Sequence, residues 1–421
     1  MRDAEIEGLV RDYLRPILNA AGLGSASVKV HLINDKRFNA FVVDSSRMFI
    51  HTGTLLNSDT PNEVIGVLAH ETGHIAGGHL ARRREALAKA QTLAVISSIL
   101  GAGATAVGVV TGSDAARAGI GVAAGGSEVA KRSFLRYIQT EELSADRAAF
   151  KYLQRTRQST QGMLKTFRKF QDQAMFTSRH VDPYVQSHPM PRERFNQLES
   201  LARRSRYFDT KDAPALQARH DLMRAKISAF TEHPSRVARR YKKNDKSLPA
   251  QYAKTIVEFR FGKPKRAIKY VDALIRKQPR NPFFRDLKGQ ILVELGTPGK
   301  AIKPYEQALA LSPQSALIRI SLGQAMVASN TKRYLKTAIQ HLRKGLAREP
   351  DYFSGYNFLA RAYARTGQQG LAKLATASAY FGQGRYTEAK RQAKFAQKQM
   401  KRGTASWLQA EDILTYKPPR Y

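Results

Sequence analysis

Residues 60–80 read TPNEVIGVLAHETGHIAGGHL, and this stretch determines how the first half of the chain is interpreted. Thr60 is a typical helix N-cap residue, Pro61 suits the first helical position, and Glu63 stands three residues after the cap, as in a capping box. An apolar run then leads into HETGH at residues 70–74. The sequence therefore predicts a helix that carries two histidines four residues apart.

The spacing of His70 and His74 indicates a metal site. Histidines four residues apart lie on one helix face about 6 Å apart, so both imidazoles can reach one ion. Glu71 would then lie beside the open coordination position, as the general base of a metallopeptidase does. Because the chain has no cysteine, its metal ligands must come from His, Asp or Glu. The alternative is a surface helix with incidental histidines.

A catalytic zinc ion needs a third protein ligand besides the two histidines. The metzincin spacing HExxHxxGxxH places Gly77 correctly but requires histidine where this chain has Leu80. His79 comes one residue earlier and would be rotated away by about 100° on a continued helix. We therefore predict a structural role for His79 and a third ligand from another helix.

The segment TEELSADRAAF offers that ligand. Glu142 and Asp146 are four residues apart and share one helix face. Glu142 is predicted to bind the metal, and Asp146 to accept the second ring N–H of a zinc-binding histidine, which fixes the tautomer of that ring. Two alternatives remain open: Glu141 as the ligand, or an exposed salt bridge from this pair to Arg147 or Lys151.

Three short segments ahead of the motif helix predict a small sheet. They are rich in β-branched and aromatic residues and are separated by polar turns. The segments are VKVHLI (28–33), NAFVVD (39–44) and RMFIHTG (47–53). Before them, MRDAEIEGLVRDYL predicts an amphipathic helix, because acidic residues stand among its apolar ones, unlike in a signal peptide. We expect either a cytosolic protein or one whose signal has been removed.

A Gly/Ala-rich insert is predicted between the two metal-binding helices, at residues 91–126. From Gln91 to Gly112 the chain has no charged residue and is about long enough to cross a bilayer. Its many glycine, alanine and serine residues nevertheless make it only weakly hydrophobic. We expect a helical hairpin that is buried or touches a membrane; a true membrane span is the alternative.

The second half of the chain repeats itself. Three times, an alanine precedes a proline by twelve residues. The pairs are Ala267 and Pro279, Ala301 and Pro313, and Ala338 and Pro350. The proline spacings of 34 and 37 residues match the tetratricopeptide period, with a three-residue insertion near residues 330–333. We therefore predict a metallopeptidase domain at 1–201, basic entry helices at 202–249 and helical repeats at 250–421.

Charge is distributed unevenly along the chain, whose formal net charge is +36. Lys and Arg outnumber Asp and Glu by 25 to 19 in residues 1–200 and by 45 to 15 in residues 201–421. A basic helical array can attract anionic membrane, acidic protein or nucleic acid, or can simply be a solvated face. The sequence has no RNP motif, KH loop, zinc finger or clustered basic-aromatic stripe, so we expect no specific nucleic-acid partner.

Taken together, these motifs resemble a known family. HETGHIAGGH followed by ELSAD, the NAF strand, the Gly/Ala-rich insert, SHPMPRERF at residues 187–195 and the repeats are similar to the HtpX-like and BepA-like gluzincin peptidases, most of all to their repeat-bearing periplasmic branch. The resemblance covers nearly the whole chain. It implies a mainly α fold with a small β-sheet, in which a gluzincin-type HExxH metallopeptidase domain is followed by a tetratricopeptide-like α-solenoid.

By this resemblance, one zinc ion per chain is held by His70, His74 and Glu142. Glu71 is the general base that takes a proton from the attacking water, and Asp146 supports a zinc-binding histidine. These five residues carry the expected chemistry.

The resemblance also implies roles outside the zinc helices. His188 matches a His-Pro element of the family, and it either stabilises the oxyanion or occupies the fourth zinc position and keeps the enzyme latent. Arg194 either pairs with a carboxylate near the site or binds the substrate. Asn39, Ala40 and Phe41 match the family's edge strand, which would hold an extended substrate by backbone pairing. An ordinary core strand end is the alternative for these three residues.

The expected activity is zinc-dependent endopeptidase cleavage of unfolded or misassembled proteins, with the repeats recruiting clients. The resemblance implies quality control in the periplasm, with outer-membrane β-barrel proteins or their assembly machinery as partners. Residues 91–126 and the basic surface would support peripheral contact with a membrane. The alternative is a latent or non-catalytic chaperone or assembly scaffold that uses the same repeat surface.

Overall fold

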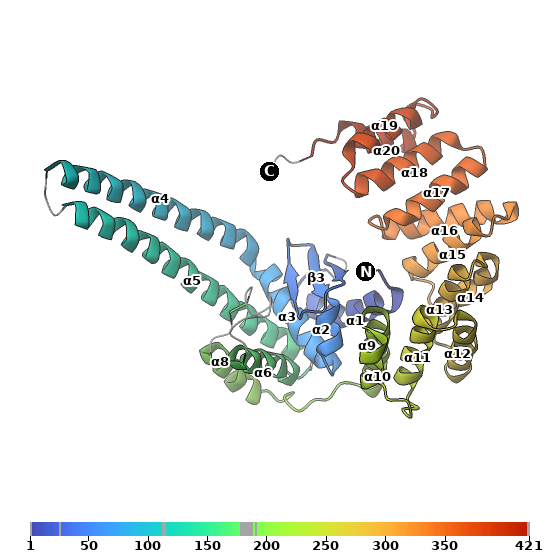
Figure 1. The fold of residues 1–421 in the computed structure, drawn as a ribbon, viewed down its shortest axis with the longest axis horizontal. Helices are drawn as coiled ribbons and strands as arrows, with labels where there is room; N and C mark the ends of the chain where they lie inside the picture. The colour runs from blue at the N-terminus through green and yellow to red at the C-terminus, as the bar shows by residue number, and fades with distance from the viewer. Residues whose placement is uncertain (1, 25–26, 112–114, 177–187, 190–191, 419–421) are drawn as a thin grey trace. The chain divides into compact units, whose positions relative to one another are not determined.

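The computed structural model describes residues 2–24, 27–111, 115–176, 188–189 and 192–418. The chain forms two compact units, one of residues 9–224 and one of residues 2–8 together with 225–421. Helices dominate both units, and the described strands form one three-stranded sheet in the first unit (Figure 1). The predicted fold class is therefore confirmed. The division into domains at residues 201 and 249 stays a prediction.

The sheet consists of β1 (Lys29–Ile33), β2 (Ala40–Val42) and β3 (Arg47–His51). The central β3 pairs in parallel with β1 and antiparallel with β2, so β2 is an edge strand. All three predicted strands are present, but β2 ends earlier than the segment NAFVVD suggested. The cause is the Asp44 carboxylate, which accepts hydrogen bonds from the backbone N–H groups of Ser46 and Arg47 at 2.8 Å each and so forms the turn.

Helix α3 (Pro61–Gly77) carries the HETGH motif and begins where the sequence predicted. The Thr60 hydroxyl accepts a hydrogen bond from the Glu63 backbone N–H at 3.4 Å. The second part of the predicted capping box, in which the Glu63 carboxylate would bind the Thr60 backbone N–H, is wrong. In the described structure this carboxylate instead faces Lys165 and Lys169 of α6 (Gln161–Phe176), at 2.8 Å from each ammonium group. Two charged donors outcompete one backbone N–H for a carboxylate.

Helices α4 (His79–Thr111) and α5 (Ala115–Arg155) pack along each other as a long hairpin (Figure 1). The predicted insert lies in this hairpin, except for residues 112–114, which are outside the described residues. Small residues of α4, such as Ala90, Ala94 and Ser97, are the less exposed ones, whereas Ile99 and Leu100 are 65% and 61% exposed. Within the described parts of the chain, no helix is both long and apolar enough to cross a bilayer.

A buried histidine joins three helical elements of the first unit. These are α1 (Ala4–Ala20), α2 (Thr52–Asn57) and α9 (Pro214–Thr231). In His220 of α9, Nδ1 lies 2.9 Å from the Tyr13 hydroxyl oxygen. Its Nε2 lies 2.9 Å from the carbonyl oxygen of Ser58, which follows α2. Because the carbonyl can only accept, the Nε2 nitrogen carries the proton and the Tyr13 hydroxyl donates to Nδ1.

Acidification is expected to destabilise the first unit through His220. Burial lowers the pKa of His220 to about 4, whereas a histidine in an unfolded chain titrates near 6.5. Below pH 6.5 the unfolded chain therefore binds a proton that the folded chain refuses, and the free energy of unfolding falls by about 2 kcal/mol between pH 7 and pH 5. Urea unfolding at both pH values measures this loss. The variant His220→Gln offers one acceptor and one donor without titrating, so an equal loss in this variant would contradict the assignment.

The second unit is a stack of helix pairs. Its helices are α10 (Pro234–Arg240), α11 (Leu248–Phe261), α12 (Pro264–Lys277), α13 (Pro282–Glu294), α14 (Pro298–Leu311), α15 (Ala316–Ala328), α16 (Leu335–Arg348), α17 (Phe353–Arg365), α18 (Gln369–Gly382), α19 (Tyr386–Gln397) and α20 (Ala405–Thr415). The repeated alanines of α12, α14 and α16 are fully buried, and each repeated proline follows its helix end by two residues. The predicted repeats are confirmed.

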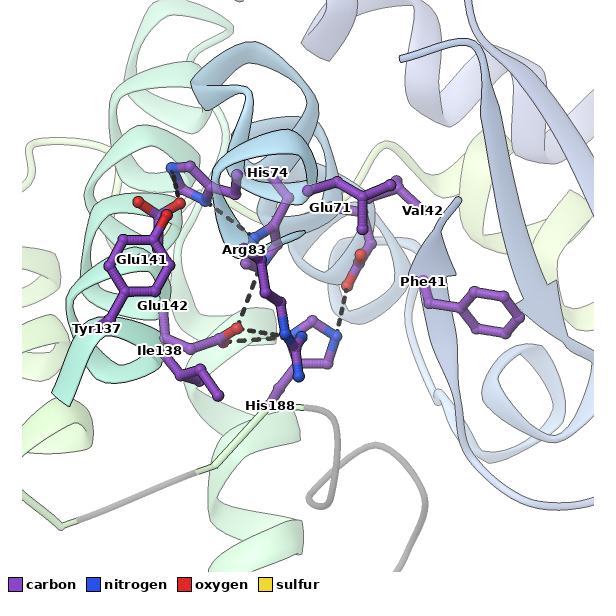
Figure 2. Close-up of a pocket in the computed structure, with 12 residues that line it drawn as sticks. Phe41, Val42, Glu71, His74, Arg83, Tyr137, Ile138, Glu141, Glu142 and His188 are labelled. Carbon is purple, nitrogen blue, oxygen red and sulfur yellow. Dashed lines mark hydrogen bonds and ion pairs between the residues drawn. The ribbon is translucent and has the colours of Figure 1, made fainter. Parts of the chain in front are cut away.

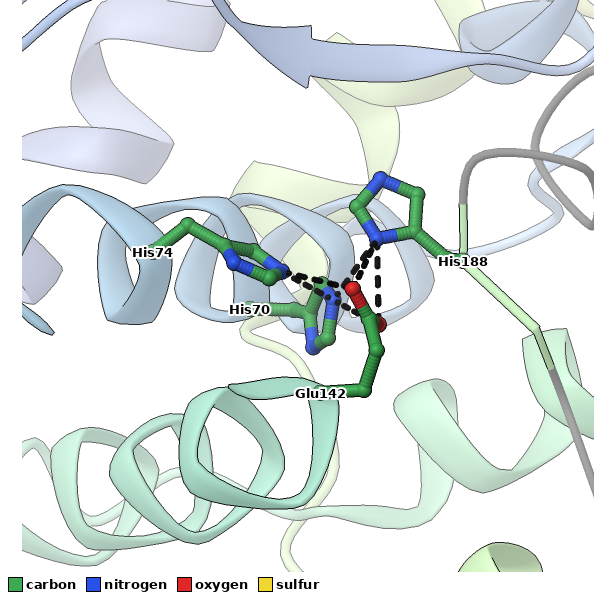
Figure 3. Close-up of side chains that lie close together, drawn as sticks. All are labelled: His70, His74, Glu142 and His188. Carbon is green, nitrogen blue, oxygen red and sulfur yellow. Dashed lines mark hydrogen bonds and ion pairs between the residues drawn. The ribbon is translucent and has the colours of Figure 1, made fainter. Parts of the chain in front are cut away.

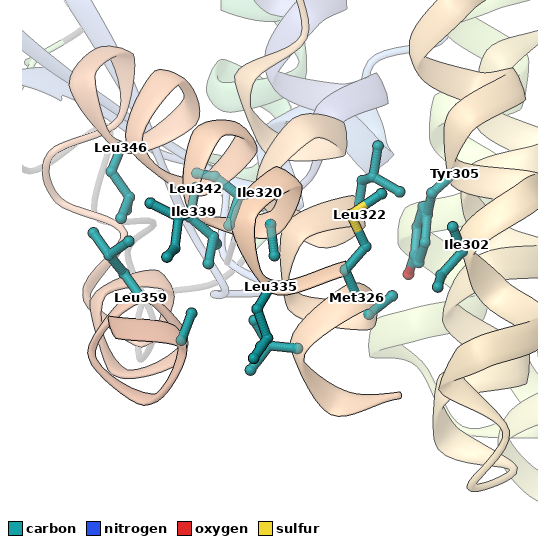
Figure 4. Close-up of a cluster of buried hydrophobic side chains, with 14 of the residues drawn as sticks. Ile302, Tyr305, Ile320, Leu322, Met326, Leu335, Ile339, Leu342, Leu346 and Leu359 are labelled. Carbon is teal, nitrogen blue, oxygen red and sulfur yellow. The ribbon is translucent and has the colours of Figure 1, made fainter. Parts of the chain in front are cut away.

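The irregular spacing of the repeats also has a structural cause. The predicted three-residue insertion forms a short 3₁₀ helix, Lys332–Tyr334, between α15 and α16. Apolar side chains of neighbouring pairs then form a continuous core, shown in Figure 4, in which Leu322 and Leu342 are 1% and 0% exposed. A helical pair cannot bury its apolar face alone, so this core is what holds the stack together.

Candidate metal centre

Four side chains of the first unit bring one donor atom each to a common point. His70 and His74 come from α3, Glu142 from α5, and His188 from the segment before α8 (Arg192–Arg203) (Figure 3). Their donor atoms all lie within 4.8 Å of one another, and all four side chains are buried. The two Nε2 atoms of His70 and His74 are 3.0 Å apart, and each lies 3.3 Å from an oxygen of Glu142.

The close approach of α3 and α5 depends on the glycine inside HETGH. A Cβ atom at Gly73 would lie 2.8 Å from the backbone oxygen of Ala145, which is closer than such atoms approach in proteins. Glycine therefore lets the α5 backbone come close enough for Glu142, three residues before Ala145, and Asp146, one residue after it, to reach the histidines of α3.

A second layer of charge surrounds the donors. Asp146 Oδ1 lies 2.9 Å from His70 Nδ1, so the carboxylate accepts the N–H that leaves His70 Nε2 facing the cluster. Arg194 of α8 donates to both oxygens of Asp146 and lies 2.9 Å from Glu142 Oε2. Burial favours a raised pKa for Asp146, but the Arg194 charge and these hydrogen bonds hold the pKa of Asp146 below its usual value.

Of the two roles considered for Arg194, the geometry favours pairing with carboxylates. Its side chain is 2% exposed, packs 5.1 Å from the Phe167 ring, and donates to the backbone oxygen of Pro189 at 2.9 Å. The last bond ties α8 to the residue that follows His188. The exposed salt bridge considered for Glu142 and Asp146 is absent, since both carboxylates are buried.

Glu71 occupies a different position from the four donors. It is fully buried, its Oε1 lies 3.5 Å from His188 Nε2, and neither carboxylate oxygen has a hydrogen-bond partner among the residues that the structure describes. Burial raises the pKa of Glu71 to about 7, against the opposing charges of His70 and His74. A buried carboxylate without a hydrogen-bond partner is costly, and such groups in native structures usually serve chemistry or bind water or an ion.

A cavity of about 90 Å³ opens beside Glu71 and His188 (Figure 2). Phe41 and Val42 of β2 line one side, and Ile138 of α5 lines the other. The cavity thus joins the edge strand to the candidate metal centre.

The register of β2 decides which backbone groups face its free edge. The His51 backbone N–H donates to the Asn39 oxygen at 2.9 Å, so Asn39 belongs to a hydrogen-bonded pair with β3. Such pairs alternate along an antiparallel ladder, and the residues between them, Ala40 and Val42, therefore turn their backbone N–H and C=O groups outward. Phe41 points its backbone toward β3 and stacks its ring on Phe49, with centroids 5.3 Å apart.

His79 and Glu141 lie beside the donors without joining them. His79 Nδ1 is 3.0 Å from His74 Nδ1, and His79 Nε2 is 3.2 Å from Glu141 Oε2. Burial lowers the pKa of His79 to about 4, so the ring is neutral at pH 7. Arg82 donates to Glu141 at 3.1 Å. The structural role predicted for His79 is consistent with these contacts, and Glu141, the alternative ligand, faces His79 rather than the donor cluster.

The donor set fits a metal ion. Three imidazole nitrogens and one carboxylate converge in a buried space, and this is a set of ligands that zinc and similar transition metals bind. The Glu71 carboxylate, whose oxygens have no hydrogen-bond partner among the described residues, stands next to His70 on α3. This combination of HExxH helix, second-helix carboxylate and adjacent base defines the class: the first unit is a metallopeptidase.

Comparison with known proteins identifies the family. Residues 2–202 match the model of peptidase family M48, and residues 252–316 match a tetratricopeptide repeat model. Residues 2–202 therefore belong to peptidase family M48, and the chain continues into tetratricopeptide repeats.

Proteins from several bacteria are similar to this chain. The chain is 24% identical over 397 residues to the β-barrel assembly-enhancing protease of Yersinia pestis, which covers 90% of this chain and 78% of that relative. It is 24% identical over 382 residues to the protein of that name from Escherichia coli K12, covering 89% and 75%. A putative β-barrel assembly-enhancing protease of Vibrio cholerae is 28% identical over 263 residues, covering 61% and 52%.

Proposed function

We propose that this chain is a zinc endopeptidase that cleaves unfolded or misassembled proteins. The observation that carries the proposal is Glu71, whose two buried oxygens have no hydrogen-bond partner among the described residues, directly beside three imidazoles and a carboxylate. Nitrogen donors with one carboxylate suit zinc better than magnesium or calcium, which prefer oxygen ligands. His70, His74 and Glu142 would hold one ion per chain.

The chain's own groups would divide the chemistry among themselves. A bound zinc ion polarises the scissile carbonyl and makes the attacking water more acidic. Glu71 accepts the proton of that water on a carboxylate oxygen and then passes it to the leaving amine. Asp146 keeps the His70 ring in the tautomer whose Nε2 faces the ion, and Arg194 holds Asp146.

The edge strand β2 would bind the substrate. Ala40 and Val42 offer outward backbone N–H and C=O groups, and Phe41 and Val42 line the cavity next to Glu71. A substrate segment that pairs with this edge must be extended, so folded proteins are excluded unless they open locally. Of the three residues expected here, Asn39 contributes least, because its backbone is bonded to His51 and to the Thr54 hydroxyl.

His188 has two roles open to it, oxyanion stabilisation or fourth ligand. The second is favoured, because His188 Nδ1 lies 3.1 Å from both oxygens of Glu142 and falls within the donor cluster. A fourth protein ligand would occupy the position that the attacking water needs.

The variant His188→Ala tests the activity and this role together. Zinc content and cleavage of an unfolded protein such as casein are measured on the wild type and the variant, before and after removal of zinc by a chelator. We expect cleavage that needs zinc in at least one of them, and a rate at least about tenfold higher in the variant, because the ligand position is freed. A lower rate in the variant would assign His188 to the oxyanion. Zinc-bound preparations that cut nothing would contradict the peptidase proposal.

The clients and the compartment are inferred from the repeats and the relatives. Residues 201–421 carry 45 Lys and Arg against 15 Asp and Glu, so the repeat surface favours acidic partners. The relatives from Yersinia pestis and Escherichia coli are named for enhancing β-barrel assembly. By analogy we propose that the chain works in the periplasm on outer-membrane β-barrel proteins or their assembly machinery.

The α4–α5 hairpin would make peripheral contact with a membrane. Its packing is the reverse of that expected in water: small side chains of α4 are the less exposed ones, and Leu93, Ile96, Ile99 and Leu100 are 48% to 65% exposed. Exposed cations stand on α4 just before this apolar stretch, at Arg83, Arg84 and Lys89, where they can reach anionic headgroups.

Vesicle flotation tests this contact. We expect the wild type to float with vesicles that contain anionic phospholipid, and the double variant Ile99→Asp with Leu100→Asp to bind at least about tenfold more weakly, because each charge must enter an apolar phase. The matched control is Leu408→Asp, which charges a leucine that is 50% exposed on α20. Equal binding by all three proteins would show that the hairpin makes no such contact.

A further inference from the structure

The His79 ring lies next to Nδ1 of His74, the ring nitrogen that does not face the donor cluster. His74 presents Nε2 to the donor cluster, 3.0 Å from His70 Nε2, and its Nδ1 lies 3.0 Å from His79 Nδ1. We propose that His79 is a positioning residue of the metal site, which accepts the Nδ1–H of His74 and thereby keeps His74 Nε2 free for the ion. This inference rests on the proposed function, because it takes His74 as a zinc ligand.

The direction of this hydrogen bond follows from the tautomers. A zinc-binding His74 that uses Nε2 carries its proton on Nδ1, so the facing nitrogen of His79 must be the acceptor. The His79 proton then lies on Nε2, and Glu141 Oε2 stands 3.2 Å from that atom. This is an ion-pair distance rather than a well-aligned hydrogen bond, but the carboxylate favours a proton on the nearer nitrogen.

Glu141 is itself fixed from a third residue. Arg82, one turn along α4 from His79, donates to Glu141 from Nη2 at 3.1 Å and from Nε at 3.3 Å. A series of contacts therefore runs from Arg82 to Glu141, from Glu141 to His79 and from His79 to His74. The two zinc histidines would differ in their support, since His70 is held by the charged Asp146 and His74 by a neutral imidazole.

Two glycines place the His79 ring. Gly78 follows α3 with φ of 64°, a left-handed conformation that ends the helix and turns the chain back into α4. A Cβ atom on Gly77 would lie 2.2 Å from His79 Nε2, so the ring occupies the space that a side chain at Gly77 would fill. In the segment GGH, Gly78 thus allows the turn between α3 and α4, and Gly77 leaves space for the His79 ring.

The arrangement also couples the hairpin to the site. His79 and Arg82 belong to α4 and Glu141 to α5, whereas His74 belongs to α3. The base of the α4–α5 hairpin therefore forms one wall of the cavity that contains Glu71 and His188. Displacement of that base would reach the proposed zinc site through His79.

Zinc affinity of the purified full chain tests the proposal, measured by competition with a chromogenic chelator at fixed pH. His79→Phe fills the space without a hydrogen bond and is expected to weaken zinc binding about 10- to 100-fold. His79→Gln can accept from His74 and donate toward Glu141, so it is expected to bind zinc within a few fold of wild type. If His79 served packing alone, the Phe variant would not bind zinc more weakly than the Gln variant.

Gly77→Ala gives a second measurement that leaves His79 in place. The added methyl group displaces the His79 ring, and we expect zinc binding to weaken as in His79→Phe. If His79→Phe does not fold, Gly77→Ala and Glu141→Ala decide the question. Wild-type zinc affinity in His79→Phe, or equal losses in the Phe and Gln variants, would overturn the positioning role and leave the peptidase proposal intact. A wild type that binds no zinc would instead sink the proposed function.

Discussion

Replacing Glu71 with glutamine is expected to reduce the rate of peptide cleavage by about 10³-fold while zinc content stays at the wild-type level. Glutamine has nearly the same shape as glutamate but cannot accept the proton of the attacking water. Glu71 is not among the four side chains that converge as donors, so the ion should remain bound. The measurement is the single-turnover rate on an unfolded substrate, with zinc determined on the same sample.

The matched control for this variant is Glu85→Gln, which removes an exposed carboxylate from α4. It should leave both zinc content and rate unchanged. If the variant Glu71→Gln cleaves as fast as wild type, the base must be another group, and His188, whose Nε2 lies 3.5 Å from Glu71, is the nearest candidate. If it loses zinc as well as activity, Glu71 contributes to the metal site in a way that the donor geometry does not suggest.

Replacing Arg194 with methionine is expected to lower the free energy of unfolding of the zinc-free chain by about 3–5 kcal/mol. Arg194 is 2% exposed and lies against both Asp146 and Glu142, which are themselves buried. Methionine keeps most of the volume and the contact with Phe167 but leaves two carboxylates without a cation. Urea unfolding monitored by circular dichroism gives the change.

Zinc should reduce this loss, because the ion supplies positive charge next to Glu142. The loss should also shrink when Asp146→Asn is added, since one of the two unpaired charges is then removed. The matched control is Arg203→Met on the same helix, whose side chain is 64% exposed and pairs with Glu199; its effect should stay below about 1 kcal/mol. Similar losses in both arginine variants would mean that the buried pairs contribute nothing special to stability.

The features that could be predicted from the sequence are those determined by residues within one or two helical turns of each other. Thr60 and Pro61 indicated the start of α3, and the structure begins the helix there. The repeated alanines and prolines gave the period of the helix pairs, since each alanine fills a tight contact and each proline follows a helix end. The spacing of Glu142 and Asp146 indicated that both carboxylates share one face of α5, and both turn toward α3.

What could not be predicted depends on residues far apart in the chain. The Glu63 half of the capping box is lost to two lysines about a hundred residues away, and no local pattern contains that competition. The choice between two roles for Arg194 likewise depended on where α8 packs. His79 was correctly excluded as a continuation of the metzincin spacing, but its contact with His74 appears only once the chain has turned at Gly78.

The position of His188 among the donors would affect the rate of cleavage but not the choice of substrate. If His188 is a ligand in the resting chain, every substrate must wait for molecules in which residue 188 has moved away, and each apparent dissociation constant equals the intrinsic one divided by that fraction. The fraction is the same for all substrates. A partner that binds only the released form therefore raises all rates together and leaves their ranking untouched, while the ranking is set at β2 and along the repeats.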